Sequence, residues 1–260
     1  MPAVRFSKWH CLGNSYILVE REDVGAALSA ALAQRLCDPG VGIGADGVLE
    51  IVAVDGGRME LLVWNPDGST AELSGNGTRI AARWLADRDG YEEVRVAVGG
   101  REIRARMRGG ALVEQEMGRV EVGKPEELLV NGERLIFTPV SVGNPHAVVD
   151  REPLRDALLR LGPLVERHPR FPGRTNVQLV RADGPHDVTA LVWERGAGET
   201  SASGTSACAV AAAAVANGWT QSPVRVHMPG GELRVDVDGD FSVRLLGPAA
   251  EICRGEAFLG

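Results

Sequence analysis

The feature that most constrains the fold of this chain is an internal repeat, in which segments of the first half recur in the second half. LGN at residues 12–14 is matched by VGN at residues 142–144, an offset of 142 minus 12, or 130 residues. The segments VRVAVGGREIRARM and VRVHMPGGELRVDV begin at Val94 and Val224, again 130 apart. Each alternates apolar and polar residues around a Gly-Gly pair, which is typical of two strands joined by a turn. The repeated offset indicates a duplication of about half the chain.

The duplication also covers two helix starts. Ser74 and Ser203 are each followed by glycine and lie 203 minus 74, or 129, residues apart. Each opens an Ala-rich stretch typical of a helix, TRIAARWLAD or TSACAVAAAAVA. Two copies of about 130 residues are too long and too few for a solenoid. We therefore expect two similar domains related by a pseudo-twofold axis, with the ligand site in the cleft between them.

Both domains are expected to be of the α/β (α+β) class. Strand-like alternation dominates each half, whereas the stretch after Ser203 is small and apolar on all sides, as in a helix that other elements enclose. Each domain is therefore expected to be a barrel-like, mixed or antiparallel sheet wrapped around a central helix. Glycine, proline and charge between Gly118 and Pro125 favour the domain boundary there, and a strand running through this stretch is the alternative.

Charge and composition exclude several classes of function. The formal net charge of −7 favours a small-molecule partner over nucleic acid or an anionic membrane. The N-terminus lacks a cationic start followed by an apolar run, and no stretch of about 18 apolar residues occurs, so we expect a soluble cytoplasmic protein. The 4 cysteines and 5 histidines are scattered, which predicts neither a metal site nor a disulfide framework.

The paired Ser-Gly helix starts indicate a site for a carboxylate. The first N–H groups of a helix lack internal partners and lie at the positive end of its dipole, so they bind anions. Two facing starts would hold one carboxylate and stabilise the charge that develops when the adjacent α proton is removed. The alternative is that Ser74 and Ser203 are ordinary N-cap residues.

Other polar residues near the repeated landmarks are candidates for ligand binding. Asn65 and Glu194 each lie nine residues ahead of their serine. Arg195 either holds a second carboxylate through two parallel hydrogen bonds or forms a surface ion pair. His146 either accepts or orients a proton near neutral pH or is a structural residue. Four asparagines in Gly- or Pro-rich segments by themselves indicate turns: Asn14, Asn76, Asn144 and Asn176.

Six ordered segments resemble the diaminopimelate epimerase family: HCLGNS, GIGADG, NPDGSTAELSGNGTR, VGNPHAVV, GRTNV and WERGAGETSASGTSACA. The resemblance implies two similar α/β domains with the C-terminal tail returning to the first, hence residues 1–117 with 248–260 and residues 118–247. It implies interconversion of LL- and meso-diaminopimelate, a step toward lysine and peptidoglycan precursors, without pyridoxal phosphate or another cofactor. By analogy with the family, a homodimer is expected.

The resemblance also implies roles for individual residues. Two bases act on opposite faces of the α carbon, and Ser74 and Ser203 stand at their positions. His146 and Glu194 match the groups that assist these bases. The reacting carboxylate would be held at the helix starts by Gly75, Asn76, Gly204 and Thr205. Further matching substrate contacts are Asn14, Asn65, Asn144, Asn176, Glu194 and Arg195, with Arg195 on the distal carboxylate.

The chain departs from the family at the two positions that correspond to the catalytic bases. The two base positions are cysteines in the family, and a thiol, with a pKa of about 8.5, is a far stronger acid than a serine hydroxyl. Each pKa unit corresponds to about 1.36 kcal/mol, so we expect epimerisation through Ser74 and Ser203 to be severely slowed. Gly47 stands where many members have glutamine, and Cys11 stands in place of a glycine.

Three explanations of the serines stay open. Both thiols were replaced by engineering, other residues perform the proton transfers, or the protein binds its ligand without catalysis. The corresponding functions are an epimerase, a thiol-free isomerase resembling the phenazine-biosynthesis branch that uses Glu194 or His146, and a ligand-binding protein.

Overall fold

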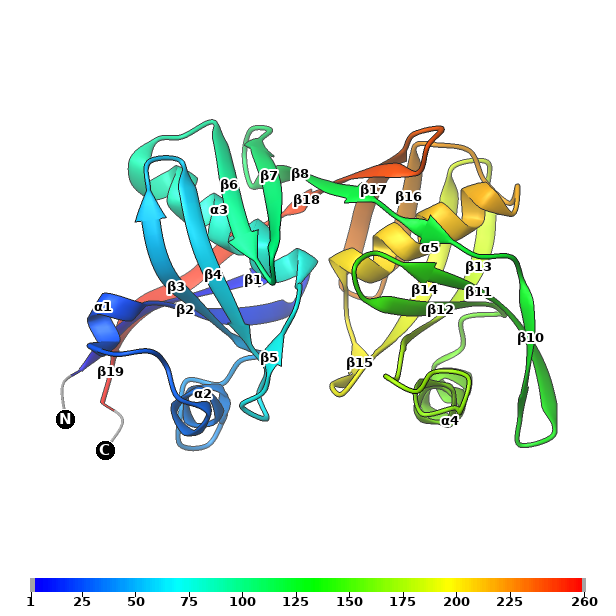
Figure 1. Ribbon diagram of the computed structural model, residues 1–260, viewed down its shortest axis with the longest axis horizontal. Helices are drawn as coiled ribbons and strands as arrows, with labels where there is room; N and C mark the ends of the chain where they lie inside the picture. The colour runs from blue at the N-terminus through cyan, green and yellow to red at the C-terminus, as the bar shows by residue number, and fades with distance from the viewer. Residues whose placement is uncertain (1–2, 259–260) are drawn as a thin grey trace. The chain divides into compact units, whose positions relative to one another are not determined.

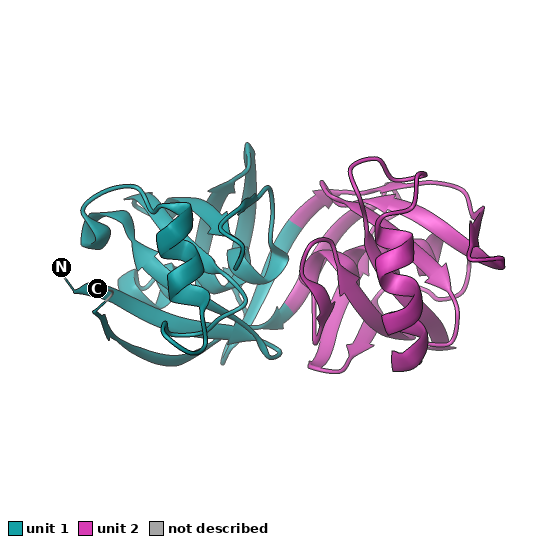
Figure 2. Cartoon of the chain, turned by 90° about the horizontal axis from the view of Figure 1, so that it is seen from below, with its two compact units in different colours: residues 1–116, 247–260 teal, residues 117–246 magenta. Residues whose placement is uncertain are grey.

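The chain forms two compact units, residues 1–116 with 247–260 and residues 117–246 (Figure 2). The computed structural model describes residues 3–258. The chain passes from unit 1 into unit 2 within strand β8 (Leu112–Arg119) and returns within β18 (Ser242–Pro248). Within the described part of the chain, no helix is long and apolar enough to cross a membrane.

Unit 1 combines strands with three helices among its described residues. The helices are α1 (Arg21–Val24), α2 (Ala30–Cys37) and α3 (Gly75–Asp89). Besides β8, the strands are β1 (Val4–Cys11), β2 (Asn14–Glu20), β3 (Val48–Asp55), β4 (Arg58–Trp64), β5 (Thr70–Ala71), β6 (Glu93–Val98), β7 (Arg101–Met107) and β19 (Ala250–Ala257).

Unit 2 has two helices, α4 (Arg155–Glu166) and α5 (Gly204–Ala216), all within the described residues. Besides β18, its strands are β9 (Glu121–Val122), β10 (Glu126–Val130), β11 (Glu133–Ser141), β12 (Pro145–Asp150), β13 (Asn176–Gly184), β14 (Asp187–Glu194), β15 (Gly198–Thr200), β16 (Val224–Met228) and β17 (Gly231–Val237).

The two units repeat one pattern of strand pairing. In unit 1 the pairs β1–β2, β3–β4 and β6–β7 are antiparallel, whereas β2–β3 and β4–β6 are parallel. In unit 2 the pairs β11–β12, β13–β14 and β16–β17 are antiparallel, whereas β12–β13 and β14–β16 are parallel. The expected mixed sheet of the α/β class is confirmed.

The repeated hairpins differ at their turns. Gly99 and Gly100 connect β6 to β7 with φ of 54° and 76°, the left-handed conformation that a two-residue turn of this type requires. In the second copy, Met228 pairs with Gly231, so the two connecting residues are Pro229 and Gly230. The predicted Gly-Gly turn is therefore correct in the first copy and shifted by one residue in the second.

One long helix packs against the strands of each unit. Every residue of α5 from Gly204 through Ala214 is buried, and the helix contacts β11, β12, β13, β14, β16 and β17 (Figure 1). The expectation of an enclosed apolar helix is confirmed there. Helix α3 contacts β1, β2, β4, β6 and β7. Its first eight residues are buried, and Asp87 near its end is exposed.

Candidate active site

The candidate residues are divided between the two units, and the set within each unit is called its cluster. Unit 1 holds Asn14, Asn65, Ser74, Gly75 and Asn76, and unit 2 holds Asn144, His146, Asn176, Glu194, Arg195, Ser203, Gly204 and Thr205. Each cluster combines the start of the long helix with residues at strand ends, such as Asn14 at the start of β2 and Glu194 at the end of β14.

Ser74 is the N-cap residue of α3. Its Oγ accepts a hydrogen bond from the Gly77 N–H at 3.0 Å. The same Oγ lies 3.0 Å from Oη of Tyr16 on β2. Sequence reasoning missed Tyr16, because the apolar run of β2 indicates that it is buried but not that it reaches a residue 58 positions further along.

Asn76, in the first turn of α3, is oriented by two side chains. Its Nδ2 donates to Oδ1 of Asn14 at 2.9 Å, and its Oδ1 accepts from Nη2 of Arg79 at 3.0 Å. Arg79 is fully buried, and its Nε donates to the carbonyl oxygen of Pro248. The helix start thus has a buried positive charge behind it, which favours an anion. Sequence reasoning missed Arg79, although a charge within an Ala-rich stretch was a signal.

Cys11 does not present a thiol for proton transfer. Its side chain is fully buried, and its Sγ donates to the backbone oxygen of Asn76 at 3.6 Å. Burial raises the pKa of the thiol above its usual value, although the nearby Arg79 opposes this. Cys208 is also fully buried, as a small core residue within α5.

Asn65 lies in a turn directly after β4. Its Nδ2 donates to Oγ of Ser69 at 2.9 Å, and its backbone N–H donates to the carbonyl oxygen of the same serine. Trp64 before it donates its indole N–H at 2.9 Å to Glu50, which also accepts from Arg21. Burial raises the pKa of the Glu50 carboxyl, but these hydrogen bonds outweigh burial and hold it below its ordinary value.

Ser203 is the N-cap residue of α5 and is buried. Its Oγ accepts from the Ser206 N–H at 3.5 Å, a longer bond than that of Ser74. The Ser206 hydroxyl in turn accepts from Nε2 of Gln178 on β13 at 3.0 Å. Sequence reasoning missed both residues, since Gln178 lies outside the repeated segments and Ser206 reads as one small residue of an Ala-rich helix.

His146 is held neutral inside unit 2. Its Nδ1 lies 3.1 Å from Nε2 of Gln178, and its Nε2 lies 2.9 Å from Oδ1 of Asn144. The Gln178 amide donates to Nδ1, so the ring proton belongs on Nε2, where it donates to Asn144. Burial, together with the positive charge of Arg195, lowers the pKa of His146 to about 3. Both ring nitrogens are engaged, which suits an orienting residue better than a base.

Asn176 connects the candidates at the ends of β12, β13 and β14. It is the parallel register partner of His146. Its Nδ2 donates to the carbonyl oxygen of Pro145 at 2.9 Å, and its Oδ1 accepts from the Arg195 N–H at 3.0 Å. The structure thus brings together Asn144, His146, Asn176 and Arg195.

The turn that carries Glu194 and Arg195 is anchored to α4. The buried Glu166 at the end of α4 accepts from the Trp193 indole N–H at 2.9 Å and from the Gly196 N–H at 3.0 Å. Glu50 and Glu166 therefore each bind the tryptophan that precedes a candidate residue. The sequence carried a signal for this pair of contacts, because Trp64 and Trp193 are separated by 193 minus 64, or 129, residues, the offset of the internal repeat.

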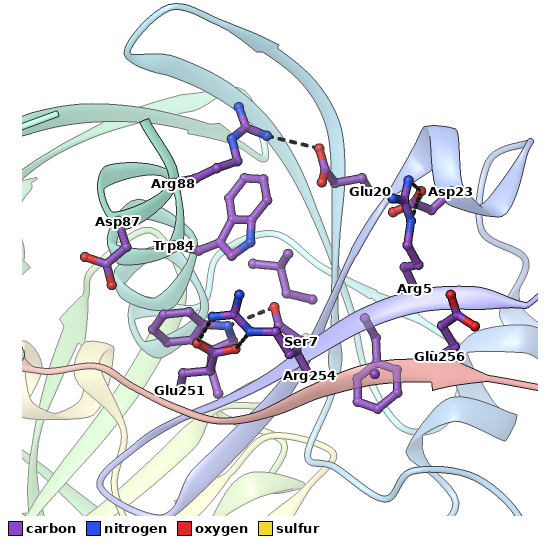
Figure 3. Close-up of a pocket in the computed structure, with 14 residues that line it drawn as sticks. Arg5, Ser7, Glu20, Asp23, Trp84, Asp87, Arg88, Glu251, Arg254 and Glu256 are labelled. Atoms are coloured by element: carbon purple, nitrogen blue, oxygen red, sulfur yellow. Dashed lines mark hydrogen bonds and ion pairs between the residues drawn. The ribbon is translucent and has the colours of Figure 1, made fainter. Parts of the chain in front are cut away.

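A separate pocket of about 540 Å³ lies in unit 1 (Figure 3). Arg88 lies over the ring of Trp84 there and forms an ion pair with Glu20, while Arg254 pairs with Glu251. None of the candidate residues lines this pocket. Within residues 3–258, no three His, Cys, Asp or Glu side chains are grouped as metal ligands.

Solved structures share this fold. A predicted epimerase from Pseudomonas aeruginosa has a TM-score of 0.72 at 19% identity and covers 99% of this chain and 100% of its own. A hydroxyproline epimerase from Agrobacterium vitis, with bound trans-4-hydroxy-L-proline, has a TM-score of 0.76 at 15% identity over 99% and 91%. A PhzF-family phenazine biosynthesis protein from Bacillus anthracis has a TM-score of 0.73 at 12% identity over 100% of each. The fold is the two-domain fold of epimerases and related isomerases.

Sequence relatives define the family. The family model described as diaminopimelate epimerase matches residues 6–123 and 138–251. Diaminopimelate epimerases from Pelotomaculum thermopropionicum and Moorella thermoacetica are 36% and 38% identical to the chain, each over 97% of it and over 98% and 99% of their own lengths. The chain belongs to the diaminopimelate epimerase family, a family of isomerases.

Proposed function

We propose that this chain is a cofactor-independent epimerase that interconverts LL- and meso-diaminopimelate, with Ser74 and Ser203 at its two base positions. The main observation in support is that Ser74 and Ser203 each cap the long helix of their unit, and that the two units have the same strand pairing. Relatives that bear the name diaminopimelate epimerase and match almost the full length support the substrate. The homodimer and the cytoplasmic location stay predictions.

In the proposed mechanism, the helix starts bind the reacting carboxylate. Backbone N–H groups at Gly75–Asn76 and Gly204–Thr205 stabilise the enediolate that forms when the α proton leaves. One serine oxygen, having given up its own hydroxyl proton, takes the α proton, while the other serine hydroxyl gives its proton to the opposite face and is left as an alkoxide. Arg195, whose backbone is fixed by Asn176, binds the distal carboxylate. The remaining contacts come from Asn14, Asn65, Asn144 and Asn176, and His146 and Glu194 orient the reacting groups.

Ligand binding without catalysis is the second candidate. Each serine Oγ already accepts a hydrogen bond from a helix N–H, and such a bond makes an oxygen less basic. A thiol-free isomerase would depend on Glu194, because His146 has its pKa lowered to about 3 and both ring nitrogens engaged.

Titration calorimetry with LL- and meso-diaminopimelate tests the substrate. We expect both to bind, and Arg195→Met to weaken binding by at least about tenfold, because a charge-assisted pair contributes about 1.5–3 kcal/mol. Arg181→Met, which changes an exposed arginine of β13, should bind as the parent does. Absence of binding for both stereoisomers would rule out this substrate.

A further inference from the structure

Tyr16 and Ser74 form a hydrogen-bonded pair of hydroxyls, with 3.0 Å between Oη and Oγ. Tyr16 is 9% exposed and has Trp9 as its cross-strand partner on β1. The Gly77 N–H donates to the same Oγ. Since this N–H occupies one lone pair of Oγ, the serine hydroxyl is fixed from two sides.

Gly47 makes room for the Tyr16 ring. A Cβ atom at position 47 would lie 2.6 Å from Cε1 of Tyr16 and 2.7 Å from the backbone oxygen of Trp64. Hydrogen bonds hold this segment against β2, because the Ile17 N–H donates to the Gly47 oxygen at 3.0 Å. Any side chain at position 47 would therefore displace the phenol. The glycine and the tyrosine are a matched pair that keeps Tyr16 on Ser74.

We propose that Tyr16 is a positioning residue that makes Ser74 competent for proton transfer by serving as its proton reservoir. This inference rests on the proposed function. In one direction, Ser74 Oγ bonds to the α proton while its own hydroxyl proton passes to the ionised Tyr16. The electron pair of the broken C–H bond stays on the substrate as the enediolate. In the other direction, the phenol returns a proton to Oγ while the serine hydroxyl protonates the α carbon.

Before the α proton is removed, the negative charge of the base then lies on a Tyr16 phenolate in place of a serine alkoxide. A phenol has an ordinary pKa of about 10, and a serine hydroxyl is a far weaker acid. The rate should therefore rise with pH as Tyr16 ionises. The elements around the pair carry further titratable and charged groups, among them Lys8, His10 and Cys11 on β1, Asp46 before β3, Glu50 on β3 and Arg79 on α3.

The test is α-proton exchange in D2O, followed by NMR for LL- and meso-diaminopimelate between pH 7 and 10. Tyr16→Phe should lower kcat by about 100-fold for the stereoisomer deprotonated by Ser74, with little change in KM, and abolish the rise with pH. In the Ser74→Cys background the same change should cost less than about threefold, because a thiol ionises unaided. Tyr91→Phe, which changes the only other tyrosine in the chain, should leave both rates unchanged.

Equal losses from Tyr16→Phe in the serine and Ser74→Cys backgrounds would show a purely structural role and overturn the proposal. It would also be overturned if the unmodified protein showed no exchange while the Ser74→Cys/Ser203→Cys variant did; diaminopimelate would then stand as the ligand, and the serine protein would bind it without catalysis. If the double variant neither bound nor exchanged diaminopimelate, both this proposal and the proposed function would fall.

Discussion

Ser74 and Ser203 occupy equivalent helix starts but differ in their surroundings. Ser74 is partly exposed, accepts its cap bond at 3.0 Å and contacts a phenol. Ser203 is 6% exposed, accepts its cap bond at 3.5 Å and is followed by the linked side chains of Ser206, Gln178 and His146. The two proposed base positions are therefore expected to contribute unequally to proton transfer.

His146 makes the free energy of unfolding depend on pH in the acid range. Its pKa of about 3 in the folded protein lies below the unfolded value of about 6.5. Between these values the unfolded chain binds more protons, so stability falls as the pH falls, by up to about 1.4 kcal/mol per pH unit. We predict that His146→Gln removes this contribution, measured by urea unfolding at pH 7, 5.5 and 4.5.

His168→Gln is the matched control, because His168 is partly exposed. It should lose stability toward acid as the parent does. An acid slope that His146→Gln leaves unchanged would show that His146 is not the neutral buried group described above.

At the level of elements, α4 holds the turn of Glu194 and Arg195 in place. Gly162 of α4 packs on Trp193, and a Cβ atom there would lie 2.7 Å from Cγ of the indole. Overpacking of this kind costs about 1–3 kcal/mol. Gly162→Ala should therefore move Trp193 off Glu166 and weaken diaminopimelate binding by about tenfold, measured by calorimetry and tryptophan fluorescence.

Gly239→Ala is the control for this change, because a Cβ atom at Gly239 meets no neighbour within 4 Å. It should bind diaminopimelate as the parent does. Unaltered binding and fluorescence in Gly162→Ala would contradict the role given to α4.

At the level of the whole molecule, unit 1 depends on the C-terminal stretch. Strand β19 pairs with β1 from Val4 opposite Ala257 to His10 opposite Ala250, and the Pro248 carbonyl accepts from Arg79. We predict that ending the chain at Leu246 lowers the hydrogen-exchange protection of β1 and β2 far more than that of β12–β14. Equal losses in both units would contradict the proposal that each unit is a separate domain.

The internal repeat predicted more of the fold than composition did. It located the hairpins that begin at Val94 and Val224 and the helices that begin after Ser74 and Ser203. Helix α4 was not predicted, because Gly162 and Pro163 lie inside it and both residues disfavour a helix interior.

Within the candidate site, the residues that could not be predicted from the sequence are those that act through tertiary contacts. Tyr16, Arg79, Gln178 and Glu166 act through hydrogen bonds to residues distant in sequence or through burial, neither of which a local pattern carries. The resemblance supplied candidates at the helix starts and strand ends. It gave no sign that a phenol contacts Ser74.

The most direct measurement is proton NMR of LL-diaminopimelate in D2O with this protein and with its Ser74→Cys/Ser203→Cys variant, following loss of the α proton and appearance of the meso isomer. Because a thiol is a far stronger acid than a serine hydroxyl, we predict that the double variant exchanges and epimerises at least about 100-fold faster than the serine protein. A folded double variant that forms no meso isomer and exchanges no α proton would contradict the assignment of Ser74 and Ser203 to the two base positions.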